Sequence, residues 1–222
     1  MVIFMKFKNM NLPNKLTTIR MFCVPLMVVL FILFMLNNIL NIPTDYIIYK
    51  NESNSLSSSI SLCQILMVII FAFASITDFI DGYLARKHNL VSDYGKLMDP
   101  LADKLLVNTT IISMMVSKMY FIYSGVEIIS IIAVFFSIIV VIRDIFVDAL
   151  RMQALKKDVV VAASIWGKLK TATLMPAIVI LLLGSINIVV FLIGLILMIL
   201  GGLFALIGGI KYYISLSKYI EE

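Results

Sequence analysis

Histidine, cysteine and charge are all scarce in this sequence. Its 222 residues include one histidine and two cysteines, and only 14% of them are charged. Cys23 and Cys63 lie in apolar stretches near opposite ends of neighbouring hydrophobic segments, so we expect separate buried thiols and no disulfide. The only histidine, His88, is expected to be solvated in a loop, and no pair of cysteines or histidines favours a zinc centre.

The low polar content excludes a soluble domain with a single core. Hydrophobic residues make up 62% of the chain, its mean hydropathy is +1.07, and soluble domains are only about half apolar. Apolar runs of about 20 residues recur, each long enough to cross a hydrocarbon layer. They lack the alternation of an outer-membrane barrel. The sequence therefore predicts an all-α integral membrane protein.

The apolar runs predict six transmembrane helices, at about 17–40, 62–84, 98–118, 126–150, 168–185 and 187–213. Pro176 interrupts the fifth, which we expect to begin near Ser164. We find no internal repeat and interpret residues 1–222 as one membrane domain, with an N-terminal interfacial segment at 1–16 and a solvated extracytoplasmic loop at 41–61. No cleavable signal peptide is expected, because the first apolar run is a full span without a small-residue cleavage pattern.

Basic residues gather on one side of this predicted topology. That side holds Lys6, Lys8, Lys15, Arg20, Arg86, Lys87, Lys96, Arg151, Lys156, Lys157, Lys168, Lys170, Lys211 and Lys218. The other side holds only Lys50 and Lys118. Because cytoplasmic loops of membrane proteins are enriched in Lys and Arg, both termini are expected in the cytoplasm, with the chain a multi-pass protein of the cell (inner, cytoplasmic) membrane. The net charge of +5 then reflects these loops and does not indicate a nucleic-acid partner.

One polar stretch, TDFIDGYLARKHNLVSDYGKLMDPLADK (77–104), interrupts the apolar pattern. Its aspartates are Asp78, Asp81, Asp93, Asp99 and Asp103. The first two are three residues apart and the last two are four apart, so each pair shares one helix face. The second predicted helix runs inward and the third runs back out across a short turn. We therefore expect these four carboxylates to converge near the cytoplasmic surface.

Four like charges in so little space require protonation or a cation. Oxygen ligands alone suit Mg²⁺ or Mn²⁺. The alternative, that the aspartates are helix caps and surface charges, suits Asp93 best. Gly82, Ala85 and Gly95 leave room for a ligand, and Arg86 can hold a phosphate bidentately. This combination indicates metal-assisted phosphoryl-type transfer.

Eight of these positions resemble a known family. The pattern D-x2-D-G-x2-A-R-x8-G-x3-D-x3-D, from Asp78 to Asp103, is that of the CDP-alcohol phosphatidyltransferases. Further segments are similar to the members that use sn-glycerol 3-phosphate: NLPNKLTTIR (11–20), DPLADKLLV (99–107), RDIFVDALR (143–151) and WGKLKTATLM (166–175). The resemblance implies a six-helix homodimer with an active site open to the cytoplasm and the lipid. It also implies CDP-diacylglycerol as donor, with phosphatidylglycerol phosphate and CMP as products.

The resemblance also assigns roles to residues. Asp78, Asp81 and Asp99 would hold the metal, most simply two ions. Asp103 would touch the metal site and take the proton of the acceptor hydroxyl. Gly82, Ala85 and Gly95 would leave room for the cytidine nucleotide, and Arg86 would contact its phosphates. The acceptor phosphate requires basic residues, for which the candidates are Arg143, Lys168, Lys170 and Arg20.

Alternatives remain open at this stage. Arg143, set in an apolar run, could instead form a salt bridge with Asp144 or Asp148, and Lys168 and Lys170 could be positive-inside anchors. The acceptor could be phosphatidylglycerol, as in a cardiolipin synthase, or serine or inositol phosphate. A divalent-cation transporter would also explain the aspartates, but not the small residues and arginine at their spacings.

Overall fold

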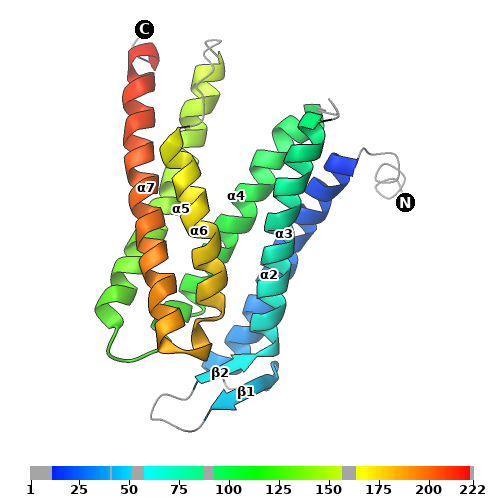
Figure 1. Ribbon diagram of the computed structural model, residues 1–222, viewed down its shortest axis with the longest axis vertical. Coiled ribbons are helices and arrows are strands. Elements are labelled where there is room, and N and C mark those ends of the chain that lie inside the picture. Colours follow the sequence, from blue (N-terminus) through cyan, green and yellow to red (C-terminus); the bar gives the residue numbers. More distant parts are fainter. Residues whose placement is uncertain (1–11, 41, 52–57, 88–92, 157–163, 221–222) are drawn as a thin grey trace. The chain divides into compact units, whose positions relative to one another are not determined.

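The computed structural model describes residues 12–40, 42–51, 58–87, 93–156 and 164–220. Within these ranges the chain forms six α-helices, two strands and two 3-10 turns (Figure 1). In chain order they are α2 (Leu12–Leu40), β1 (Ile47–Asn51), β2 (Ser58–Ser61), α3 (Leu62–Lys87), α4 (Asp93–Val116), η1 (Met119–Phe121), α5 (Glu127–Lys156), α6 (Ile165–Leu182), η2 (Gly184–Ile186) and α7 (Ile188–Ile220). His88 and most of the predicted N-terminal segment lie outside the described residues.

The helices confirm the all-α fold class, and each predicted span coincides with one of them. The fifth begins at Ile165, directly after Ser164, whose Oγ accepts a hydrogen bond of 3.2 Å from the Gly167 N–H and so caps the helix. Four helices are long and apolar enough to cross a membrane, over Asn14–Asn37, Glu127–Ala154, Ile165–Leu182 and Ile188–Ser215. The chain is therefore a multi-pass membrane protein.

The loop at 41–61 contains more structure than its Asn- and Ser-rich composition indicated. Strands β1 and β2 pair into a two-stranded sheet, which suits the β-branched and aromatic residues of the segment. Ser61 and Gln64 then form a reciprocal capping box at the start of α3. The Gln64 N–H donates to Ser61 Oγ at 3.3 Å, and the Ser61 N–H donates to Gln64 Oε1 at 3.0 Å. Asp45 Oδ1 also accepts from the Cys63 N–H, which ties the loop to α3.

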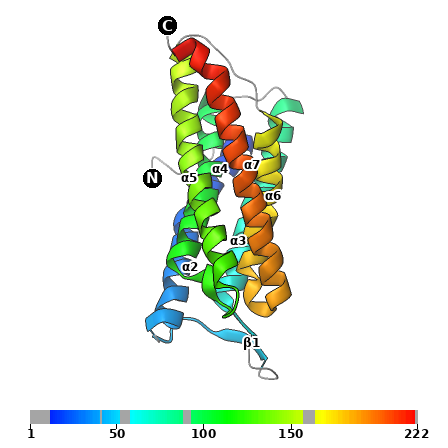
Figure 2. The same cartoon turned by 90° about the vertical axis from the view of Figure 1, so that its left-hand side faces the viewer.

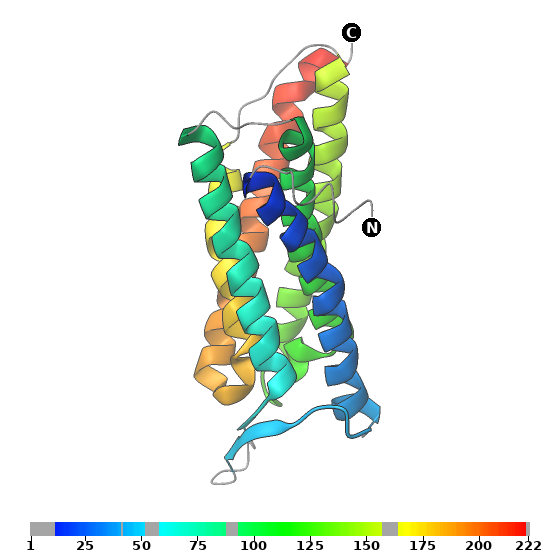
Figure 3. The ribbon, with the colours of Figure 1, turned by 90° about the vertical axis from the view of Figure 1, so that its right-hand side faces the viewer.

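The described chain divides into two compact units, which are taken separately below. The first contains α2, the paired strands, α3 and α4. Helix α2 packs against both α3 and α4 (Figure 3). The core of this unit includes Met27 and Phe31 of α2, Met67 and Phe71 of α3, and Leu106 of α4, all of them buried. This packing brings both helices that carry the aspartates onto one partner helix.

In the second unit, α7 packs against both α5 and α6 (Figure 2). Glycines recur at intervals of seven where α7 meets α6. A Cβ atom at Gly194 would stand 2.8 Å from Leu181 Cγ, and one at Gly201 would stand 2.6 Å from Leu174 Cδ2. Both distances are shorter than any normal carbon contact, so only glycine permits this approach. Small residues are the usual means by which membrane helices pack closely.

A second row of glycines on α7 faces α5. A Cβ atom at Gly202 would stand 2.5 Å from Phe136 Cβ, and one at Gly209 would stand 3.0 Å from Arg143 Cγ. Since both members of each contact advance by seven residues, α5 and α7 run in the same direction and in fixed register.

Helix α5 also holds the turn η1 through a buried hydrogen bond. The Tyr120 hydroxyl lies 2.8 Å from Ser137 Oγ, which itself donates to the Ala133 carbonyl at 2.8 Å. Tyr120 is therefore the donor in this pair. Burial raises the pKa of the Tyr120 phenol above its ordinary value, so the hydroxyl keeps its proton at neutral pH.

We predict that Gly202→Ala destabilises the protein by about 1–3 kcal/mol, the usual cost of overpacking a core. The new methyl group would meet Phe136 Cβ, which is fixed to the backbone of α5. Thermal unfolding of the purified protein in detergent measures the effect. Gly167→Ala is the matched control, because its methyl group would make an ordinary 3.6 Å contact with Ser164 Oγ. Equal stability of the two variants would contradict the close packing of α5 and α7.

Candidate active site

Helices α3 and α4 carry the aspartate motif on unbroken helical backbone. Helix α3 continues through Asp78 and Asp81 to Lys87, and α4 begins at Asp93 and includes Asp99 and Asp103. The spacings of three and four residues therefore place each pair on one helix face, as predicted. Among the four aspartates, the side chain of Asp103 is described, and it is half-buried with an interaction partner. For the other seven motif positions the structure describes only the helical backbone: Asp78, Asp81, Gly82, Ala85, Arg86, Gly95 and Asp99.

Five residues separate the end of α3 at Lys87 from the start of α4 at Asp93. An extended chain of this length spans about 20 Å at most, which limits how far apart the two halves of the motif can lie. The described side chains alone form no group of three or more metal-binding residues, which leaves the predicted set of four aspartates untested. Its all-oxygen chemistry and uninterrupted helical register fit a hard divalent cation.

Helix α2 presents a row of buried polar residues inside the first unit. Asn14, Thr17 and Arg20 follow one another at intervals of three, and Thr17 and Arg20 are almost completely buried. All three have interaction partners. An arginine in an apolar unit is stable only when its charge is compensated. Arg20 thus faces the interior of the unit that contains the aspartates, and its role at the acceptor stays a prediction.

The second unit brings two of the predicted acceptor-binding residues together on one carboxylate. Lys170 Nζ, from α6, donates to both oxygens of Asp144 at 2.6 Å. Arg143 Nη1, from α5, donates to Asp144 Oδ1 at 3.1 Å. The side chain of Asp144 is only 2% exposed, and those of Lys170 and Arg143 are 10% and 13% exposed. Lys168, two residues before Lys170, is exposed.

Comparison with known proteins decides the family. Residues 10–200 match the CDP-alcohol phosphatidyltransferase family. The chain belongs to this family.

Several relatives of this phosphatidyltransferase have a common name, CDP-diacylglycerol–glycerol-3-phosphate 3-phosphatidyltransferase. The protein of Mycoplasma pneumoniae is 37% identical over 76% of this chain and 66% of its own length, just under two thirds. That of Rickettsia typhi is 37% identical over 79% of this chain and 78% of its own. That of Bacillus subtilis is 34% identical over 79% of this chain and 78% of its own.

The sequence predicted no role for Asp144 in this phosphatidyltransferase except as an alternative salt-bridge partner of Arg143. That salt bridge is present. Its stronger contact, with Lys170, crosses from α5 to α6 and joins residues 26 positions apart. The one available signal was the Arg-Asp pair inside an apolar run, because an acid at that depth must have a cationic partner. The acceptor role of Arg143 and Lys170 stays a prediction.

We predict that Asp144→Asn lowers the unfolding free energy of this phosphatidyltransferase by about 3 kcal/mol or more. The change removes the carboxylate that binds Lys170 at 2.6 Å through both oxygens. Chemical denaturation in detergent is the measurement. The control is the double variant Asp144→Leu with Lys170→Met, which removes the carboxylate together with its closer cation. It should recover part of the stability, although Arg143 still loses its carboxylate partner. A single variant as stable as wild type would show that the pair contributes little.

Proposed function

We propose that this protein transfers the phosphatidyl group of CDP-diacylglycerol to sn-glycerol 3-phosphate. The products are phosphatidylglycerol phosphate and CMP. The observation that carries the proposal is the complete eight-position motif from Asp78 to Asp103, in a chain whose relatives of 34–37% identity are named for this reaction. The protein acts as a homodimer at the cytoplasmic side of the inner membrane.

Members of the family generally depend on a divalent metal ion. In our proposal, Asp78, Asp81 and Asp99 would hold the metal, as two Mg²⁺ or Mn²⁺ ions, with Asp103 at the border of this site. When bound, the metal would supply positive charge to offset the negative charge of the diphosphate. Asp103 accepts the proton of the acceptor C1 hydroxyl while the oxygen attacks the β-phosphorus. A new P–O bond then forms to the acceptor as the P–O bond to CMP breaks.

The donor site uses small residues and one arginine. Gly82, Ala85 and Gly95 admit the cytidine nucleotide close to the backbone of α3 and α4. Arg86, one residue before the end of α3, contacts the phosphates of the nucleotide through its planar guanidinium group.

The acceptor phosphate is bound by basic residues, and Asp144 organises two of them. Arg143 and Lys170 come from different helices, yet both donate to the buried carboxylate of Asp144. This arrangement holds two cations in place before the acceptor arrives, which reduces the entropy lost on binding. Lys168 and Arg20 complete the proposed set.

An acceptor panel tests the proposal. Purified protein receives labelled CDP-diacylglycerol with sn-glycerol 3-phosphate, phosphatidylglycerol, serine or inositol phosphate, and CMP release is followed. We expect release only with sn-glycerol 3-phosphate, and a different preferred acceptor would overturn the assignment.

Arg143→Ala should raise the acceptor KM about tenfold, which corresponds to the loss of one charged hydrogen bond, and should leave the donor KM unchanged. Arg143→Lys should recover only part of this loss.

We also predict that Asp78→Asn, Asp81→Asn and Asp99→Asn each lower turnover by about 10²-fold or more, the scale of one lost electrostatic stabiliser. Chelation of divalent cations should abolish activity, and added Mg²⁺ or Mn²⁺ should restore it. Near-normal turnover in two correctly inserted variants would remove these aspartates from the metal site. Metal uptake into protein-containing vesicles, without CMP release, would instead support a cation transporter.

A further inference from the structure

A groove of about 360 Å³ lies between α5 and α7, within the second unit. Most of its wall is formed by Ile139, Ile142 and Phe146 of α5 and by Leu206, Ile210 and Tyr213 of α7. On each helix these positions share one face. The groove falls inside the apolar spans Glu127–Ala154 and Ile188–Ser215, and two of its side chains, Ile142 and Ile210, are more than half exposed. It is therefore open to the surrounding lipid, and its volume is that of a small ligand pocket.

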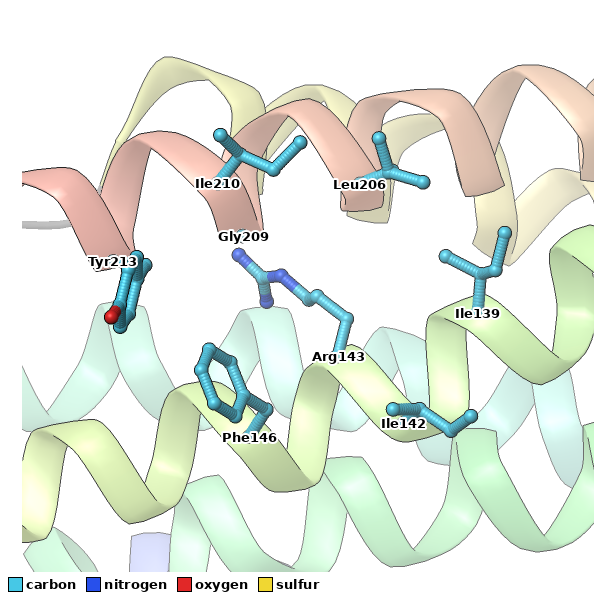
Figure 4. A pocket seen from close by; sticks show the side chains of 8 residues that line it. All are labelled: Ile139, Ile142, Arg143, Phe146, Leu206, Gly209, Ile210 and Tyr213. Atoms are coloured by element: carbon cyan, nitrogen blue, oxygen red, sulfur yellow. The ribbon is translucent and has the colours of Figure 1, made fainter.

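One charged side chain, Arg143, reaches into this apolar groove. Figure 4 shows its guanidinium group extending from α5 towards Gly209 of α7, with Phe146 and Tyr213 on one side and Ile139 and Leu206 on the other. The pose depends on Gly209, because a Cβ atom there would stand 3.0 Å from Arg143 Cγ. The phenyl and phenol rings of Phe146 and Tyr213, with centroids 6.0 Å apart, close one end of the groove.

The guanidinium group keeps unused hydrogen-bond donors. Arg143 Nη1 donates to Asp144 Oδ1, but the same carboxylate is bound more closely by Lys170. Arg143 Nε is buried and finds no acceptor among the described residues. A buried donor without an acceptor is destabilising, and a charge in an apolar groove adds to that cost. The groove thus favours a ligand that has both an anionic group and an apolar chain.

We propose that the α5–α7 groove binds an anionic phospholipid from the bilayer, with its phosphate on Arg143 and one acyl chain along Ile139, Ile142 and Leu206. On α7, Gly209 is about 9 Å of helix from the end of the apolar span at Ser215, and on α5, Arg143 is about 16 Å from the end of its span at Ala154. The guanidinium group lies beside Gly209, on the side of the groove where the apolar span ends sooner. A second copy of the chain fits less well, because a two-fold interface centred on the groove would set Arg143 against its own copy.

Lipid binding would also regulate the enzyme. This consequence rests on the proposed function, in which Arg143 binds the acceptor phosphate. A lipid phosphate and the acceptor phosphate would then compete for one guanidinium group. Anionic lipid should raise the acceptor KM and leave kcat unchanged, so that synthesis slows as anionic phospholipid accumulates in the membrane.

Trp166, the only tryptophan of the chain, provides a reporter for the groove. Trp166 lies close to Arg143, because both residues border Gly208. A Cβ atom added at Gly208 would stand 3.1 Å from Trp166 Cβ and 3.5 Å from Arg143 Nη2. The protein is reconstituted in phosphatidylcholine vesicles that contain a small share of brominated phosphatidylglycerol or brominated phosphatidylcholine, and Trp166 fluorescence is recorded. We expect an apparent preference of about fivefold for the anionic lipid, which corresponds to one basic side chain facing it.

The preference should disappear in Arg143→Gln and persist in Arg151→Gln. Arg151 is a matched control because it lies on the same helix but packs over the Tyr212 ring, 5.5 Å from its centroid, and does not line the groove. Equal quenching by both lipids in the wild-type protein would overturn the proposal, as would a preference that survives Arg143→Gln. Loss of the preference in Arg151→Gln would also overturn it, because the effect would then be a general surface charge.

Inorganic phosphate distinguishes a lipid from a free anion. Because the acyl chain contributes to binding, millimolar phosphate should leave the quenching by brominated phosphatidylglycerol nearly unchanged, whereas full reversal would show that the groove selects phosphate alone. The fluorescence measurement contains no donor or acceptor. Its result therefore stands whether or not the acceptor panel supports the proposed reaction.

Discussion

The second unit depends on how a negative charge is kept inside an apolar bundle. Asp144 is almost fully buried, and its carboxylate is stable there because Lys170 meets both oxygens and Arg143 meets one. This contact joins α5 to α6, while the side chain of Arg143 passes over Gly209 and so depends on α7 as well. One ionic group therefore links all three long helices of the unit.

In the first unit, polar residues lie at both ends of α3. The motif from Asp78 to Asp103 lies where α3 ends and α4 begins. At the other end of α3, Ser61 and Gln64 satisfy backbone groups of the first turn. The helix is thus capped by neutral side chains at one end and carries aspartates of the motif at the other.

The sequence predicted the helices well because apolar runs and polar breaks are local signals. It also predicted the start of α6 near Ser164, although the cap that fixes this start was recognised only in the structure. The paired strands were missed, because a composition rich in Asn and Ser hid the β-forming Ile47 and Ile48. The contact between Asp144 and Lys170 could not be read, since it depends on which faces of α5 and α6 meet. The α5–α7 groove could not be predicted either, because it depends on which faces of α5 and α7 meet and on the space left by Gly209, which has no side chain.

The two rows of glycine on α7 have a mechanical consequence. Each glycine accepts one bulky partner, as Gly201 accepts Leu174 and Gly202 accepts Phe136, and a shift of α7 by one residue would place Leu200 or Leu203 at these contacts. Sliding along the helix axis is therefore blocked at several points at once. Axial shear between packed helices, a common route of conformational change, is therefore opposed at each of these contacts. Sliding of α7 past its two neighbours would cost more than movement of the three helices as one body.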